Sequence, residues 1–413
     1  MTALAYGIDF GTTNSAISVA SRGQAEMVPI GRRGSLIMPS MLYLDETGNH
    51  LVGDDAIQTF LVRGGSGGRL IASLKSVLTD ETFTSTKGPD GRRYGLDDLV
   101  AILLRGLKRH ADRHCGGSVD RLVLGHPVAF VGAEGAGFAR RQALAEDRLY
   151  RGAEKAGFGQ ITLVDESSAA LQGEEMSTGT LMSVDFGGGT FDVSIMIATP
   201  TSWPVVASEG AAIGGEGFDA MLFDAKLSKP LGLVESYRLG MGGKHLSVPV
   251  TLRGMRTLNG ILAMSTEGRI KAILENWRDE LPVVYDIIDG GHSWEFYKAI
   301  ESAKIALSDE AKTTIRFARP STRIAIHESV SREEFERLIA RDLGVIDVTI
   351  SRALGKAGLD EEGIDLVART GGSSQIPAFI ELLTRRFGHR KVEERDAFNT
   401  VALGLGLKAF ELW

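Results

Sequence analysis

The chain has 413 residues, 43% hydrophobic and 24% charged, so we expect a packed globular protein of roughly two or three domains rather than a disordered one. A net charge of −7 without a concentrated Lys/Arg run argues against nucleic acid as a partner. One cysteine excludes an intrachain disulfide, and the lack of a signal peptide or of a ~20-residue apolar run predicts a cytoplasmic protein with no membrane contact.

The first predicted element is a β-hairpin over residues 6–20. An alternating apolar strand runs into Asp9-Phe10-Gly11, and a second alternating strand follows the turn. The turn itself carries hydroxyl and amide side chains, namely Thr12, Thr13 and Asn14.

One further strand and three helical segments are predicted after the first hairpin. Residues 25–30 are predicted to form a third strand, and residues 54–62 a short helix. The pattern of residues 69–78, which include Lys75, is helical, and residues 96–114 form a clear amphipathic helix.

A second group of elements ends in two acidic residues. Strands are predicted over residues 121–125 and 161–164, with a long helix over residues 134–157 between them. Asp165 and Glu166 follow the second strand, where functional carboxylates often lie. From this position alone, a helix cap or a first-turn acid is the simpler explanation.

Residues 183–197 repeat the pattern of the first hairpin. The turn here is Asp185-Phe186-Gly187-Gly188-Gly189-Thr190. Glycines let backbone N–H groups close on an anion, and the nearby carboxylates would repel phosphate unless a cation such as Mg²⁺ lay between them. Two matched hairpins favour two similar lobes sharing one metal–phosphate site over two ordinary glycine-rich turns.

The C-terminal half adds more glycine-bearing helix starts. Gly214, Gly215 and Glu216 precede a helix predicted over residues 218–227, and glycines at a helix N-terminus can bind an anion. Residues 231–289 suggest a smaller, mostly helical subdomain. A helix over residues 294–308 places three polar residues on one stripe, namely Glu301, Lys304 and Ser308.

The last predicted elements are a capped helix, a strand and two further helices. Ser331 and Glu334 form a capping-box signature. A strand over residues 366–368 runs into Gly371, Gly372 and Ser373, and helices follow from Pro377 and over residues 400–411. Complete P-loop, dinucleotide-binding and protein-kinase motif sets are all absent.

Taken together, these motifs resemble the ATPase domain of the DnaK-type heat-shock chaperones along nearly the whole chain. The resemblance rests on residues 7–15, 184–194, 214–219 and 371–377, and on the Glu301, Lys304 and Ser308 spacing. The short length, and Gly-His-Pro-Val at residues 125–128 in place of the usual Val-Pro-Ala-Tyr, are most similar to the truncated YegD-like branch.

The resemblance implies an α/β, actin-like ATPase fold with two ribonuclease-H-like lobes around a nucleotide cleft. Lobe I would span residues 1–176, with 32–116 as its smaller subdomain and 393–413 returning to it. Lobe II would span residues 177–392, with 224–302 as its smaller subdomain.

The resemblance also implies ATP or ADP and Mg²⁺ as ligands, with roles for single residues. Asp9 and Asp185 would hold hydrated Mg²⁺, Lys75 and Thr190 would contact the reacting phosphate, and Glu166 would orient water. The other implied nucleotide contacts are Gly11, Thr12, Thr13, Asn14, Gly187, Gly188, Gly189, Gly214, Gly215, Glu216, Glu301, Lys304, Ser308, Gly371, Gly372, Ser373 and Gln375.

The sequence also departs from the family pattern. Ile305 and Gln375 stand where two arginines usually hold the adenine, Ser167 replaces a proline after Glu166, and Phe398 is near a usually acidic position. Because the chain stops at Trp413, the linker and peptide-binding domain are expected to be missing.

Three functions remain open at this point: an ATPase, a nucleotide-gated interaction module with little turnover, and a small-molecule kinase. The nucleotide is the one partner that the sequence indicates, and a protein partner stays unidentified.

Overall fold

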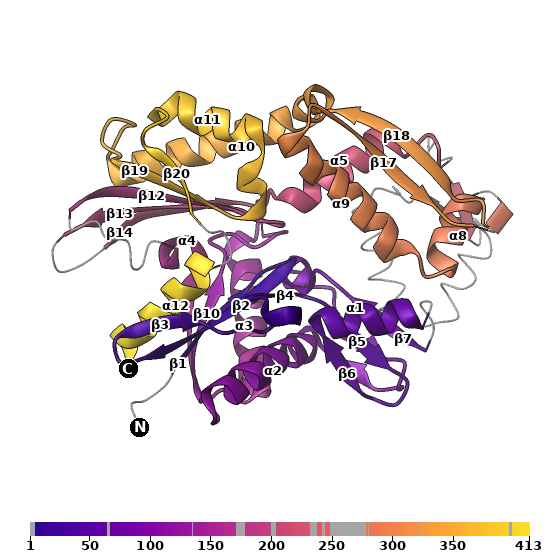
Figure 1. The fold of residues 1–413 in the computed structure, drawn as a ribbon, viewed down its shortest axis with the longest axis horizontal. Helices are drawn as coiled ribbons and strands as arrows, with labels where there is room; N and C mark the ends of the chain where they lie inside the picture. Colours follow the sequence, from indigo (N-terminus) through magenta and orange to yellow (C-terminus); the bar gives the residue numbers. More distant parts are fainter. Residues whose placement is uncertain are drawn as a thin grey trace.

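The computed structural model describes residues 5–63, 67–133, 135–170, 178–199, 204–231, 238–241, 244–247, 278–279, 281–320, 322–395 and 399–413. Within these ranges two main β-sheets are each covered by helices, and Figure 1 shows one sheet above the other. None of the helices in these ranges combines the length and the apolar character needed to cross a membrane.

The first sheet has the order β11-β10-β1-β2-β3, with β4 beside β2. The strand β1 runs antiparallel to β2 and parallel to β10, and β10 is parallel to β11. The strands are β1 (Ala5–Phe10), β2 (Asn14–Ser21), β3 (Gln24–Met27), β4 (Ile37–Pro39), β10 (Arg121–His126) and β11 (Gln160–Asp165).

The second sheet repeats this arrangement in the order β14-β13-β12-β19-β20. Here β12 is antiparallel to β13 and parallel to β19, which is parallel to β20. The strands are β12 (Gly179–Phe186), β13 (Phe191–Ala198), β14 (Val205–Ala211), β19 (Leu366–Thr370) and β20 (Val392–Glu394). Both predicted hairpins are therefore confirmed, and each begins the antiparallel part of its sheet.

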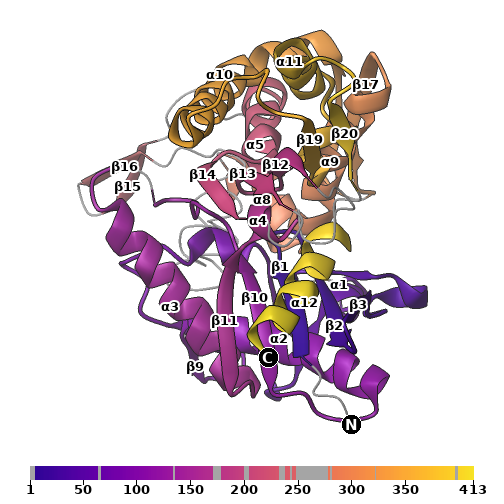
Figure 2. The same cartoon turned by 90° about the vertical axis from the view of Figure 1, so that its left-hand side faces the viewer.

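Helices cover both faces of the first sheet, and we call these elements together lobe I. On one face, α2 (Leu96–Cys115) and α3 (Phe138–Ala156) share one apolar core with the strands. On the other face lie α4 (Glu166–Ala169) and α12 (Asn399–Leu412), as Figure 2 shows for α12. The approach is close, because a Cβ at Gly404 would lie 1.8 Å from the carbonyl oxygen of Ala169.

The second sheet and its helices form lobe II, around the largest apolar core in the described chain. The predicted capping box is present at the start of α10, where Ser331 Oγ accepts from the backbone of Glu334. The elements are α5 (Gly215–Lys226), α8 (Pro282–Asp289), α9 (Ser293–Asp309), β17 (Lys312–Ala318), β18 (Ala325–Ser331), α10 (Arg332–Ala357) and α11 (Pro377–Phe387).

Smaller elements extend from each lobe. In lobe I, α1 packs on a three-stranded sheet in the order β6-β5-β7. The remaining elements are η1 (Arg32–Gly34), β5 (Leu42–Asp45), β6 (His50–Val52), α1 (Gly53–Val62), β7 (Gly68–Ile71), η2 (Leu74–Val77), β8 (Thr86–Lys87), β9 (Arg93–Tyr94), β15 (Arg238–Met241), β16 (Lys244–Ser247) and η3 (Gly372–Gln375).

One predicted helix is wrong. Residues 69–78 form the strand β7 followed by the short 3-10 helix η2, because β7 pairs with β5 along its whole length. Two other helices differ at their starts. The helix α5 begins at Gly215 rather than after Gly217, and α3 begins at Phe138, after Gly137 in a left-handed conformation (φ 88°).

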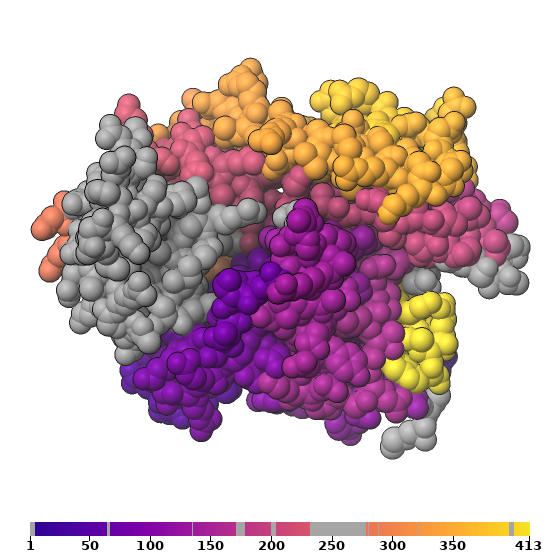
Figure 3. Space-filling model, turned by 180° about the vertical axis from the view of Figure 1, so that it is seen from behind, coloured from indigo at the N-terminus to yellow at the C-terminus, as the bar shows by residue number. Residues whose placement is uncertain are grey.

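The two lobes meet along the middle of the molecule when it is seen from behind (Figure 3). The short helix α4 of lobe I packs against β12 and β13 of lobe II at this junction. The division at residues 176 and 177, Phe398 and about half of the subdomain predicted over 224–302 lie outside the described residues. The boundaries of the two lobes and of their subdomains therefore stay a prediction.

Candidate functional site

The turns of the two matched hairpins face each other across the junction between the lobes. A Cβ atom at Gly188 would lie 2.7 Å from Thr13 Oγ1, and one at Gly189 would lie 2.8 Å from Thr12 Oγ1. Any larger residue at these two glycines would collide with the opposite turn. The glycines therefore let two sets of backbone N–H groups come close together, as a phosphate site requires.

Beside these turns lies a pocket of about 480 Å³. It is lined by elements of both lobes, and all but one of the residues that the sequence suggested are among those that line it. From lobe I these are Asp9, Gly11, Thr12, Thr13, Asn14, Lys75 and Glu166. From lobe II these are Asp185, Gly187, Gly188, Gly189, Thr190, Gly215, Glu216, Glu301, Lys304, Ser308, Gly371, Gly372, Ser373 and Gln375.

Gly214 is the suggested residue that does not line the pocket. It precedes α5, and a Cβ there would lie 2.4 Å from the carbonyl oxygen of Gly188. Gly214 therefore packs against the backbone of the turn, and this close contact is possible because glycine has no side chain.

A buried ion pair lies at one end of the pocket. Lys75 Nζ is 2.6 Å from Glu166 Oε1, and each side chain is only 6% exposed. Burial acts to lower the pKa of Lys75, but the carboxylates of Glu166 and Asp9 outweigh it, so the pKa is raised and the ammonium is retained. Glu166 fits because a Cβ at Gly125 would lie 2.9 Å from its Cγ.

Negative charge exceeds positive charge around this pair. Burial raises the pKa of Asp9 and Asp192 well above the usual range and that of Asp185 to about 6, and in each case the charge of Glu166 adds to the shift. Lys75 is the cation that opposes all three shifts. Several carboxylates around one ammonium would favour a divalent cation.

The donor set fits Mg²⁺ better than a metal held by protein alone. Within the described ranges, no group of three or more His, Cys, Asp or Glu side chains is close enough to enclose a metal ion. Mg²⁺ usually keeps several of its waters and binds through one or two carboxylates together with phosphate oxygens. The carboxylates beside the two glycine-bearing turns, where phosphate oxygens could bind, match that preference.

The other end of the pocket is built on α9. Lys304 Nζ donates to Asp219 Oδ2 and to the carbonyl oxygen of Gly215, both at 2.9 Å, and Asp219 is 1% exposed. Lys298 Nζ lies 2.5 Å from Glu301 Oε2. The two contacts of Lys304 tie α9 to α5 beside the pocket, whereas the Lys298–Glu301 pair lies within α9.

The loop after β19 closes this end. Gly371 has a φ of +85°, and a Cβ there would lie 2.3 Å from the carbonyl oxygen of Phe186, so only glycine fits. Ser373 Oγ donates to the carbonyl oxygen of Gly187 at 2.8 Å, which ties this loop to the glycine turn of the second hairpin. Two further lining residues differ in what they present to the pocket: Ile305 is 58% exposed and offers apolar surface, whereas the amide of Gln375 already donates to Glu394 at 2.5 Å.

A family model described as Hsp70 protein matches residues 72–229 and 292–410. These segments cover more than half of the chain. The chain belongs to the Hsp70 protein family. Hsp70 proteins are ATP-binding ATPases of the chaperone type, and the family establishes the actin-like ATPase fold that the two related sheets display. Placement within the YegD-like branch stays a prediction.

The matched Hsp70 segments contain Lys75, Glu166 and both partners of the Lys304–Asp219 contact, whereas the first hairpin lies before them. The sequence pattern places Asp192 beside the second turn but gives it no role, and it does not suggest Asp219, which lines the pocket. Pairing in the second hairpin places Asp192 opposite Asp185, and a helix starting at Gly215 places Asp219 one turn later. The place of Asp219 therefore follows from local geometry and could have been found from the sequence.

Proposed function

We propose that this protein binds ATP with Mg²⁺ in the pocket between its lobes and hydrolyses it slowly to ADP and phosphate. The observation that carries the proposal is the buried Lys75–Glu166 pair among the carboxylates of Asp9 and Asp185, directly beside two opposed phosphate turns. Phosphoryl transfer depends mainly on positioning and charge neutralisation, and this arrangement offers both.

We assign separate roles to the residues around the two turns. The backbone of both turns, with Thr12 and Thr13, would hold the phosphates. Asp9 and Asp185 would hold hydrated Mg²⁺, which supplies positive charge to the phosphate oxygens when bound. Lys75 and Thr190 would contact the transferred group.

Glu166 would orient the attacking water. Its carboxylate is held by Lys75 on one side and by the backbone around Gly125 on the other, so it can accept a hydrogen bond in a defined direction. The polar stripe of α9 and the loop after β19 would bind the adenosine, with Glu301, Lys304, Ser308 and Ser373 nearest to it. Nucleotide binding between the lobes would bias how far they open.

One observation favours a second candidate, a nucleotide-gated module with little turnover. Lys75 is bonded to Glu166 at 2.6 Å, so the two groups needed for hydrolysis satisfy each other. A phosphate that failed to draw Lys75 away from this partner would be bound without being cleaved.

Phosphate release under single-turnover conditions, with and without Mg²⁺ and with a panel of sugars and polyols, tests the proposal. We expect release without any acceptor, and a fall of roughly two to four powers of ten in Lys75→Ala, if Lys75 positions the reacting groups. Lys87→Ala, which removes an exposed lysine of the same lobe, is the control.

The other outcomes would replace the proposal. Loss of ATP only with an acceptor would indicate a kinase, and binding without loss would indicate the module. Equal rates in Lys75→Ala and in the parent protein would refute the role assigned to Lys75.

A further inference from the structure

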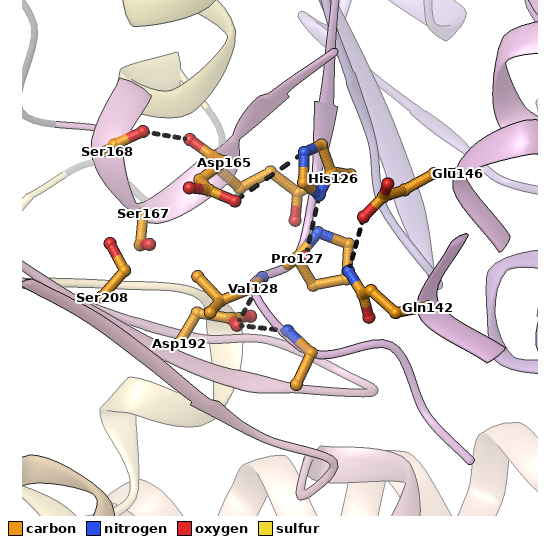
Figure 4. Close-up of polar contacts among 12 residues, drawn as sticks. His126, Pro127, Val128, Gln142, Glu146, Asp165, Ser167, Ser168, Asp192 and Ser208 are labelled. Atoms are coloured by element: carbon orange, nitrogen blue, oxygen red, sulfur yellow. Dashed lines mark hydrogen bonds and ion pairs between the residues drawn. The ribbon is translucent and has the colours of Figure 1, made fainter. Parts of the chain in front are cut away.

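Two alternate residues of the lobe II strand β13 have side chains that form hydrogen bonds with lobe I. Asp192 and Ser194 are both fully buried and share one face of the strand. Asp192 Oδ1 accepts from the backbone N–H of Val128 at 2.8 Å, and Ser194 Oγ shares a 2.7 Å hydrogen bond with Ser167 Oγ. Figure 4 shows Asp192 reaching the segment after His126 and Ser167 facing the strands of lobe II.

The two contacted segments of lobe I lie on either side of Glu166. Ser167 is the next residue in the chain and belongs to the same short helix, α4. Val128 follows β10, and Gly125 of that strand is the residue against which the side chain of Glu166 lies. Lobe II therefore contacts both parts of lobe I that surround this carboxylate.

The serine contact depends on how the lobes are placed. Ser167 and Ser194 are both fully buried, and Ser194 Oγ also shares a 2.7 Å hydrogen bond with Ser208 Oγ within lobe II. A buried hydroxyl that loses its hydrogen-bond partner destabilises the protein. A hydrogen bond weakens when its donor–acceptor distance grows by a few tenths of an ångström. Apolar side chains here would allow sliding, whereas this pair favours one relative placement.

We propose that Ser167 and Ser194 are a positioning pair that couples the placement of lobe II to the orientation of Glu166. Neither hydroxyl touches the reacting atoms. A movement of lobe II that keeps the pair bonded keeps α4, and with it Glu166, aligned with the pocket, and a movement that separates the pair releases α4. This inference rests on the proposed ATP hydrolysis.

A double-mutant cycle on hydrolysis tests the pair. Ser167→Ala, Ser194→Ala and the double variant should each lower the single-turnover rate by roughly three- to tenfold, with the ATP dissociation constant unchanged within about twofold. The double variant should be no slower than the slower single variant, because either single change already removes the Ser167–Ser194 bond. Ser168→Ala is the matched control, since Ser168 Oγ donates at 2.8 Å to Asp165 O within lobe I.

Two results would overturn the proposal: effects of the two single changes that multiply in the double variant, or rates that stay at the parent value. Thermal unfolding of each variant accompanies the rates. Removing both hydroxyls leaves neither member of the pair unpaired, and Ser208 Oγ, which also loses its bond to Ser194, is only partly buried, so the double variant should fold.

A second measurement separates this inference from the proposed function. The backbone N–H of Ala170 donates to the carbonyl oxygen of Glu166 at 3.0 Å, so its hydrogen exchange reports on α4. In the nucleotide-free protein, Ser194→Ala in lobe II should speed this exchange in lobe I by roughly three- to tenfold, and Ser168→Ala should not. A parent protein without hydrolysis would refute the proposed function alone, whereas unchanged exchange in Ser194→Ala would refute the pair.

Discussion

The end of the pocket where we propose that the adenine binds offers the sharpest quantitative test. Ile305 lines the pocket with 58% of its surface exposed, and it stands where relatives are expected to carry an arginine. Gln375 stands at the second such position, but its amide donates to Glu394, whose other oxygen lies 2.8 Å from Arg369 Nη2. We therefore expect Ile305→Arg to tighten ADP binding, and Gln375→Arg to do so less, because its guanidinium would pair with Glu394.

The magnitudes follow from what each side chain can offer a base. Burying a whole isoleucine side chain is worth about 1.5–3 kcal/mol, so covering the exposed 58% of Ile305 gives roughly 0.9–1.7 kcal/mol. An arginine over an aromatic ring gives about 0.5–2 kcal/mol, and its alkyl stem keeps part of the apolar contact. The parent should then bind ADP with a micromolar dissociation constant, and the double variant roughly tenfold to a hundredfold more tightly.

Titration calorimetry with ADP and GDP in the presence of Mg²⁺ measures both affinity and base preference. Val348→Arg is the control, because Val348 is a similarly exposed apolar residue on α10 that does not line the pocket. Nanomolar binding by the parent, no change in Ile305→Arg, or an equal gain in Val348→Arg would each refute this placement of the base.

Three further predictions concern the stability of the nucleotide-free protein. Lys75→Ala should lower the free energy of unfolding by about 3–5 kcal/mol, because Glu166 is left buried without a counterion, and adding Glu166→Gln should recover most of it; urea denaturation measures both. Because burial raises the pKa of Asp185 to about 6, the folded state holds this proton more tightly than the unfolded state does. Stability should thus fall as pH rises through 6, and Asp185→Asn should reduce that dependence; melting temperatures between pH 5 and pH 8 that were flat for the parent would contradict it. Gly404→Ala should destabilise by about 1–3 kcal/mol, because its methyl group meets the backbone of α4, while Gly344→Ala, in open space on α10, should cost nothing in the same denaturation assay.

Local sequence patterns were sufficient for much of the secondary structure. Both hairpins, the long helices α2 and α10 and the capping box at Ser331 follow from periodicity and turn chemistry within a few residues. The order of glycine and acidic motifs along the chain was also sufficient to indicate the family. These features depend on neighbours in the sequence, so the sequence by itself determined them.

Tertiary structure decided the features that depend on distant residues. Residues 69–78 have a helical pattern, yet β7 is a strand because β5 offers it hydrogen bonds from elsewhere in the chain. Lys75 and Glu166, 91 residues apart, become an ion pair only when η2 and α4 meet. Whether Ser167 is an ordinary helix residue or a contact to lobe II depends on where β13 lies, because a hydroxyl acquires a role only from the partner that packing places within hydrogen-bond distance.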